Sequence, residues 1–209
     1  MSPVSDYEIH EIVTRVVRQT LGTELTGASA PAPQPAKTVA SQPFALSKAP
    51  DTAGRKVVAI GTDHGGVELK NLLIKELNNL GFAVQDCGTN TSDPVDYPDI
   101  ALAVAMLVAE GKAWRGVIID GAGIGSCMAA NKVPGVRAAM CYDYATAVNS
   151  REHNDANVLT LGAGLVGNNL ARQILTTWLA TDFGGGRHAK RVDKIIAIEK
   201  KYGRDGKAA

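Results

Sequence analysis

The sequence is poor in cysteine and in aromatic residues, and it contains no long apolar run. Its three cysteines, Cys87, Cys127 and Cys141, lack the spacing of a metal site. Their odd number, without a secretory signal, predicts reduced thiols rather than a disulfide framework. No segment approaches the roughly 18 consecutive apolar residues of a membrane helix. We therefore expect a cytoplasmic protein that is not inserted in a membrane.

Neither sign of charge dominates the chain. Lysine and arginine number 22, aspartate and glutamate number 21, and the net charge is +1. Such a balance creates no field that would draw nucleic acid or an anionic membrane. We expect neither as a partner, so any anion site must be built locally.

Composition divides the 209 residues into three parts. The first carries isoleucine, valine and leucine at helical spacing, opposite a charged face, and begins with a capping-box pattern at Ser5 and Glu8. The second is rich in alanine, proline, serine and threonine, as flexible linkers are. The predicted parts are an amphipathic targeting helix over residues 1–22, a linker over 23–55 and one domain over 56–209.

From Lys56 onward, short apolar runs alternate with longer amphipathic segments, which is typical of a parallel sheet with crossover helices. The expected fold is an open, doubly wound α/β sheet, which binds ligands at the carboxyl ends of its strands. The five predicted strands are VVAIGT, FAVQD, GVIID, VRAAM and NVLTLG. Helices are predicted over residues 67–80, 98–110, 126–132, 144–152, 168–181 and 187–202.

Asp63 and His64 follow the first predicted strand, where the chain turns into a helix. A carboxylate and an imidazole placed together can handle a sugar hydroxyl. A purely structural explanation stays equally open, in which Asp63 caps the helix and His64 is an exposed turn residue.

A glycine-rich loop follows the third predicted strand. Backbone N–H groups at Gly121, Gly123, Gly125 and Ser126 can converge on a developing oxyanion, as an enediolate requires. The alternative is a tight turn that lets the next helix pack closely. Asp120, which ends the strand, is either a general base or an acceptor that fixes the loop.

Residues 150–157, SREHNDAN, concentrate polar groups directly before an apolar strand. A solvated helix end explains the charges but not the histidine with two asparagines. His153 is a candidate acid for opening a sugar ring.

Residues 162–167, GAGLVG, satisfy the G-x-G-x-x-G pattern of dinucleotide sites. They follow the last strand, however, and no acidic residue ends a later strand to bind a ribose hydroxyl. We therefore expect these glycines to serve helix packing.

Residues 184–191, GGGRHAKR, place a flexible run before a cationic helix. Arg187 and Arg191 are four residues apart and share one face, so together with helix-end N–H groups they can bind a phosphate. A solvated basic face is the alternative.

Taken together and in this order, GTDHGG, DYPD, AANKVPGVRA, SREHNDANVL and GGGRHAKRV resemble the family of ribose-5-phosphate isomerase B and the galactose-6-phosphate isomerase subunits. The resemblance runs from about Val57 to Tyr202. It implies a Rossmann-like five-stranded fold and an isomerisation that needs no metal or other cofactor. It also implies a homodimer or homotetramer whose sites lie between subunits.

The resemblance assigns roles to the matching residues. It implies that Asp63 and His64 contact the sugar. His153 would assist ring opening and Asn154 would support the enediolate. The phosphate would be held by cations reaching across from a neighbouring subunit, namely Arg187 and Arg191, with Arg137 and His188 as weaker candidates.

The chain departs from the family pattern at four positions. Many members have a cysteine base where this chain has Asp120, and a hydroxyl residue where it has Ala122. Others have a glutamate at Ser126, and some offer an arginine at Gly164. The usual thiol base and the alternative carboxylate are therefore both missing.

Asp120 is the first choice for the base in this chain. A carboxylate with a pKa of about 3.9 is a weaker base than a thiolate but is almost fully ionised at neutral pH. Burial is expected to raise its pKa towards the working range. Cys127 is the second choice, because a helix N-terminus lowers the pKa of a thiol.

The N-terminal helix and its linker resemble the encapsulation peptides of bacterial microcompartment cargo. Such a helix can dock its apolar stripe into a shell protein or join other cargo helices. The alternative is a helix that packs on its own domain or on a second subunit.

Three functions remain open. The first is interconversion of ribose 5-phosphate and ribulose 5-phosphate, and the second is the same chemistry on another sugar phosphate. The third is a non-catalytic sugar-phosphate-binding or scaffold subunit, against which the joint retention of His153, Asn154 and the arginine pair argues.

Overall fold

The computed structural model describes Arg15, Thr52 and residues 54–203. The chain divides into two units, Met1–Gln42 and Pro43–Ala209, and every described residue except Arg15 belongs to the second. Arg15 is helical, but the rest of the predicted N-terminal helix and most of the linker lie outside the described residues.

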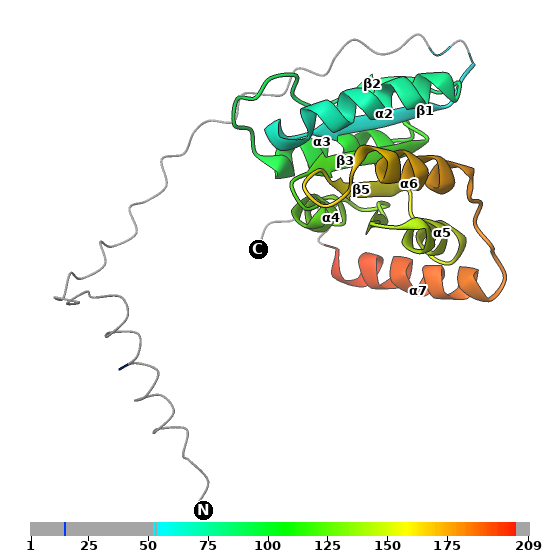
Figure 1. Ribbon diagram of the computed structural model, residues 1–209. Helices are drawn as coiled ribbons and strands as arrows, with labels where there is room; N and C mark the ends of the chain where they lie inside the picture. The colour runs from blue at the N-terminus through cyan, green and yellow to red at the C-terminus, as the bar shows by residue number, and fades with distance from the viewer. Residues whose placement is uncertain (1–14, 16–51, 53, 204–209) are drawn as a thin grey trace, which may run out of the picture. The chain divides into compact units, whose positions relative to one another are not determined.

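Five parallel strands form one sheet in the order β2-β1-β3-β5-β4. The predicted α/β fold is thereby confirmed, with a strand at each of the five predicted apolar runs (Figure 1). The fourth strand is shorter than its apolar run because only three of its residues pair with β5. The strands are β1 (Val57–Thr62), β2 (Ala83–Asp86), β3 (Arg115–Asp120), β4 (Ala138–Met140) and β5 (Val158–Gly162).

The helices also follow the prediction closely. The helix predicted over 126–132 begins two residues earlier, at Ile124, because Gly123 ends the preceding loop in the left-handed region at φ 79°. None of the described helices is long and apolar enough to cross a membrane. The elements are η1 (His64–Gly66), α2 (Val67–Asn79), α3 (Tyr97–Ala109), α4 (Ile124–Ala130), α5 (Tyr144–Glu152), α6 (Asn168–Ala180) and α7 (Arg187–Tyr202).

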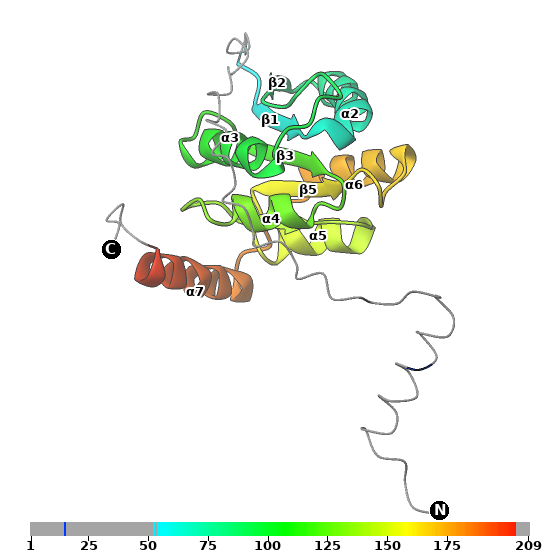
Figure 2. The same ribbon diagram turned by 90° about the vertical axis from the view of Figure 1, so that its left-hand side faces the viewer.

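Helices cover both faces of the sheet (Figure 2). Side chains of α2, α5 and α6 pack with Val58 and Ile60 on one face, whereas α3 and α4 pack with Ala59 and Ile118 on the other. This division follows from the alternation of side chains along a strand. Both faces of the central strands are therefore buried, which explains their nearly continuous apolar sequence.

The sheet has its topological switch point at β1, whose neighbours β2 and β3 lie on opposite sides. In open α/β sheets the crevice for ligands lies outside the carboxyl ends of the strands at this point. Thr62 of β1 pairs with Ile119 of β3, so the residues that follow these two strands share that crevice.

Candidate active site

The predicted site residues fall into two groups at opposite ends of the strands. Asp63 directly follows β1 and Asp120 ends β3, so both lie at the carboxyl ends. His153 comes after α5 and before β5, at the amino end, and the start of α7 joins it there because Gly184 N donates to Glu152 O at 2.9 Å. Figure 1 shows α4 and the start of α7 at the two ends of the sheet. A strand of this length separates the groups by about 16 Å.

Asp63 caps η1 at the carboxyl end. Its Oδ1 accepts a hydrogen bond from Gly65 N at 2.9 Å, and the residue is 9% exposed. Its Oδ2 accepts no hydrogen bond from the described residues and is not among the fully buried polar atoms that lack a partner. Asp63 therefore fulfils the structural role open to it and still has one oxygen for a ligand.

His64, the next residue, is exposed. Its Nδ1 accepts a hydrogen bond from Val95 N at 3.4 Å. A neutral imidazole that accepts at Nδ1 carries its proton on Nε2. His64 thus presents an N–H donor rather than a lone pair.

The carboxylate of Asp120 accepts hydrogen bonds from the backbone of the glycine-rich loop that follows it. Its Oδ1 accepts from Ala122 N at 2.8 Å and from Gly123 N, while its Oδ2 accepts from Ser126 N at 2.9 Å. The residue is only 4% exposed. The loop-fixing role is therefore observed, and two of the backbone donors expected to hold an enediolate, those of Gly123 and Ser126, already bind this carboxylate.

The expected rise in the pKa of Asp120 is wrong. Burial alone would raise it, but hydrogen bonds from Ser126 and from the backbone of Gly123 and Ala122 lower the pKa below its ordinary value. These donors favour the ionised form more than desolvation disfavours it. Asp120 is consequently a weaker base than an ordinary aspartate.

Cys127 faces away from the crevice. Its thiol donates to Ala138 O of β4 at 3.4 Å, and Asn131 Nδ2 lies 3.6 Å from the sulfur. β4 is the edge strand farthest from β1 and β2 along the sheet. The position in the first turn of α4 therefore does not direct the thiol towards Asp63 or Asp120.

At the amino end, His153 lies between α5 and α7. Asn149 Nδ2 and His153 Nδ1 are 2.8 Å apart, and the imidazole stacks on that of His188 with ring centroids 4.0 Å apart. Asn154 donates to Asn149 O at 3.1 Å and to its side-chain oxygen at 3.2 Å. The structure thus brings together three of the predicted residues, His153, Asn154 and His188.

The cations at the start of α7 complete this second group. Gly185 and Gly186 have φ values of 60° and 53°, which glycine adopts without strain and which turn the chain into the helix. Arg187 Nε donates to His188 Nε2 at 3.4 Å, and both Arg187 and Arg191 are exposed. Their guanidinium groups are open to an anion on the outer side of α7.

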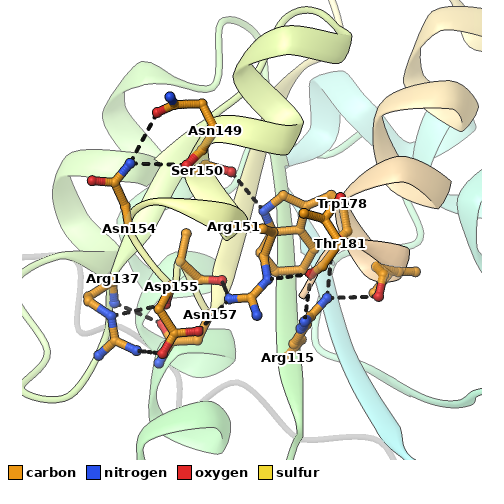
Figure 3. Close-up of polar contacts among 12 residues, drawn as sticks. Arg115, Arg137, Asn149, Ser150, Arg151, Asn154, Asp155, Asn157, Trp178 and Thr181 are labelled. Atoms are coloured by element: carbon orange, nitrogen blue, oxygen red, sulfur yellow. Dashed lines mark hydrogen bonds and ion pairs between the residues drawn. The ribbon is translucent and has the colours of Figure 1, made fainter. Parts of the chain in front are cut away.

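Arg137 belongs to a separate network (Figure 3). Its Nη2 lies 2.9 Å from Asp155 Oδ2, and its Nε donates to Asp155 O at 3.0 Å. Asp155 Oδ1 accepts from Arg151 Nη1 at 2.8 Å. Much of the polar density of residues 150–157 is therefore structural, and Asp155 occupies part of the hydrogen-bonding capacity of Arg137.

A cavity of about 790 Å³ lies between β4, α5 and α7. Arg137 and Asn154 line it, whereas Asp63 and Asp120 do not. The remaining walls come from Asn131, Val136, Ala138, Ala139, Met140, Ala145, Thr146, Asn149, Ser150, Ala156, Ile195, Ile196 and Glu199.

Gly162 has a packing role, although it packs against a loop rather than against the helix that was expected. A Cβ at this position would lie 2.6 Å from Ala122 O, so only glycine permits the contact with the loop after β3. Gly164 N donates to Gly121 O at 3.0 Å in the same contact. These glycines pack the two loops at the carboxyl end against each other.

Residues 58–195 match the family described as Ribose/Galactose Isomerase. The chain belongs to this family. It is 44% identical over 146 residues to ribose-5-phosphate isomerase B of Escherichia coli K12, covering 70% of this chain and 98% of that one. It is 41% identical over 139 residues to D-erythrulose-4-phosphate isomerase of Pectobacterium atrosepticum, covering 66% and 91%. A structure of ribose-5-phosphate isomerase B from Clostridium thermocellum is similar with a TM-score of 0.69 and 52% identity, covering 70% and 99%.

Membership of the ribose/galactose isomerase family makes this chain an aldose–ketose isomerase of sugar phosphates. The expected family and enzyme class are confirmed. This enzyme class argues against a non-catalytic sugar-phosphate-binding or scaffold subunit.

Tyr97 is a polar group at the carboxyl end that the sequence reasoning did not select. A Cβ at Gly125 would lie 2.8 Å from the hydroxyl of Tyr97, so the phenol lies directly against the glycine-rich loop of this isomerase. The residue begins α3 and is 40% exposed. The motif DYPD, quoted above for the family resemblance, contains Tyr97 and was the sequence feature that could have identified it.

Proposed function

We propose that this isomerase interconverts ribose 5-phosphate and ribulose 5-phosphate through an enediolate. The observation that carries the proposal is the likeness, over nearly their full length, to proteins named ribose-5-phosphate isomerase B. The polar groups described above supply the parts that such a reaction requires, namely an acid for ring opening, cations for a phosphate and carboxylates at the opposite end of the strands.

The active site joins two copies of the chain. Asp63 and His153 lie at opposite ends of the strands, at a separation too large for one five-carbon substrate to bridge. A second copy that places its amino end against the carboxyl end of the first brings the two groups together. A two-fold axis then creates two equivalent sites in a homodimer.

An exposed side of α7, which borders the cavity at Ile195, supports this arrangement. Arg187, Arg191, Ile195, Ile198 and Tyr202 lie along one side of the helix at spacings of three and four residues. The three apolar members are 46%, 60% and 69% exposed. Covering such an apolar stripe with a second chain lowers the free energy of the assembly. The cationic end of α7 then lies at the partner's site.

Each residue of the amino-end group has a role in this proposal. His153 donates the proton that opens the furanose ring, with its orientation set by Asn149 and by the stacked ring of His188. Asn154 supports the enediolate, and Arg187, Arg191 and His188 bind the phosphate.

We further propose that residues 5–22 target the isomerase to a bacterial microcompartment. Their support is the apolar stripe and the proline-rich linker that follows it. Ile12→Glu with Val16→Glu would abolish co-purification with shells, whereas Thr14→Glu on the polar face would not. Equal recovery of both variants with the shells would contradict the proposal.

A second candidate substrate is D-erythrulose 4-phosphate. The relative from Pectobacterium bears that name. The family resemblance also implies that this chain lacks a hydroxyl residue at Ala122 and an arginine at Gly164 that some members have. This candidate keeps the enediolate chemistry and changes only the length of the sugar.

Turnover by the purified full-length chain tests the proposal. We expect kcat/KM for ribose 5-phosphate to exceed that for D-erythrulose 4-phosphate by about tenfold or more, since one missing substrate contact typically changes specificity to this extent. His153→Ala should reduce turnover of the furanose substrate strongly, while Arg172→Gln, on the exposed side of α6, should not. A reversed preference would assign the enzyme to the four-carbon sugar, and no turnover of either would refute both.

A further inference from the structure

The carboxylate of Asp120 is largely occupied by the loop that follows it, because Oδ1 accepts two backbone hydrogen bonds and Oδ2 accepts one. The residue is 4% exposed. Protonation of this carboxylate would break the bonds that hold Ala122, Gly123 and Ser126 in place. The group that fills the position of the usual base therefore fixes the loop instead.

Cys127 does not take over this function. Its thiol points at Ala138 O of the edge strand β4, whereas the crevice at the switch point lies between β1 and β3. A thiolate at that place would also lose its present hydrogen bond to a carbonyl oxygen, which accepts from the S–H but cannot donate.

Asp63 is a carboxylate at the crevice that keeps an oxygen without a hydrogen bond from the described residues. It follows β1, the strand adjacent to β3, and its backbone N–H donates to Ile119 O at 3.4 Å. One oxygen caps η1 and thereby fixes the side chain, while Oδ2 accepts nothing from the described part of the chain. A base needs this combination of a fixed orientation and an open lone pair.

His64 supplies the complementary group. The hydrogen bond from Val95 N to Nδ1 places the proton of the neutral ring on Nε2, so the ring donates to an oxygen and does not compete as a base. Triosephosphate isomerase combines a carboxylate base with a neutral histidine donor in the same way for an enolisation.

We propose that Asp63 is the proton-abstracting base of this isomerase and that His64 stabilises the developing oxyanion through Nε2–H. The inference rests on the proposed enediolate reaction. Asp63 removes the proton from C2 of the open-chain aldose, and the C–H electron pair forms the C1–C2 double bond as the carbonyl π pair moves to O1. The O2 proton then passes to O1, the carbonyl forms at C2, and protonated Asp63 delivers its proton to C1.

Asp63→Asn tests this assignment without removing the helix cap. Asparagine caps a helix as well as aspartate does, so its side-chain oxygen retains the bond from Gly65 N and the melting temperature should stay within about 2 °C of wild type. We expect kcat to fall by about 10³-fold or more, with little change in KM. Incorporation of solvent deuterium at C2 of the recovered aldose should stop.

Asp120→Asn provides the matched comparison. It should lower the melting temperature and retain most of the deuterium exchange of wild type at a temperature where the protein is folded. The assignment is overturned if Asp63→Asn still exchanges deuterium at C2, or if Asp120→Asn loses exchange while folded and Asp63→Asn does not. Failure of wild type to turn over any aldose phosphate would instead refute the proposed function, and the base assignment with it.

Discussion

The imidazole rings of His153 and His188 stack with their centroids 4.0 Å apart and their planes within 5° of parallel. The contact joins the end of α5 to the first turn of α7, and Gly184 N reinforces it through Glu152 O. A residue expected to open the sugar ring and a residue expected near the phosphate are therefore one unit.

Acidification should weaken the His153–His188 stack. Burial, and then the nearby charges of His153, Arg187 and Arg191, lower the pKa of His188 below its ordinary value. A lowered pKa in the folded state means that the stabilisation is complete above the unfolded value of about 6.5 and is lost as the pH falls below it. His188→Phe, which keeps a ring but cannot titrate, should show a smaller drop in melting temperature between pH 7.5 and 5.5. Equal drops in both proteins would contradict this account.

Asp120→Asn should lower the free energy of unfolding at pH 7 by about 2 kcal/mol, because an amide N–H₂ would face backbone N–H donors. Since the folded pKa of Asp120 lies below the unfolded value, the carboxylate stabilises the protein above about pH 4 and loses this effect at lower pH. Urea unfolding at pH 7 and pH 3 should show the difference from wild type shrinking with acid. Asp193→Asn on the exposed side of α7 serves as the control and should show no such gap.

Arg115 anchors the end of α6. Its guanidinium donates to Trp178 O at 2.8 Å and Leu179 O at 3.0 Å and lies 4.1 Å from the centre of the Trp114 ring. Burial lowers its pKa to about 10, so it stays charged at neutral pH. Arg115→Lys should destabilise the protein by about 2–3 kcal/mol in urea unfolding, because lysine lacks the planar fork.

The matched control for that substitution is Arg172→Lys. Arg172 is on the same helix, is exposed and lies 3.9 Å from Glu76. Its replacement should change the free energy of unfolding by less than about 0.5 kcal/mol. Equal effects at both positions would show that the buried carbonyl contacts of Arg115 contribute nothing particular.

Arg137 and Arg187 should respond differently to replacement by glutamine. Arg187→Gln should raise KM for the sugar phosphate by about tenfold or more with little change in stability, since its guanidinium is exposed and free to bind an anion. Arg137→Gln should lower the melting temperature, because Asp155 loses a partner at 2.9 Å. A larger rise in KM for Arg137→Gln than for Arg187→Gln would return Arg137 to the phosphate site.

Much of the fold could be predicted because the strands are short and apolar and the helices are bounded by glycine, proline and polar residues. β3 illustrates this, since all of its residues are buried and a polar loop follows it. The ends of β4 and α4 were harder to predict. Pairing with β5 determines the length of β4, and the left-handed conformation of Gly123 determines where α4 begins.

The chemistry of individual side chains was harder to predict. Asp120 was recognised as either a base or a loop acceptor, but the choice depends on which N–H groups point at it in three dimensions. The stacking of His153 on His188 joins residues far apart in sequence, and no local pattern encodes it. The placement of Asp63 and His153 at opposite ends, by contrast, follows from the predicted parallel topology alone.

In the proposed homodimer, that placement means that two damaged chains can complement one another. In a mixed dimer of Asp63→Asn and His153→Ala, one site receives both defects, while the other combines an intact Asp63 with an intact His153. Random exchange of subunits between the two inactive proteins should therefore restore about a quarter of the wild-type turnover, since half of the dimers are mixed and each holds one sound site. In genetic terms, a mutant allele with a defect at Asp63 and one with a defect at His153 should therefore complement each other when both are expressed in one cell.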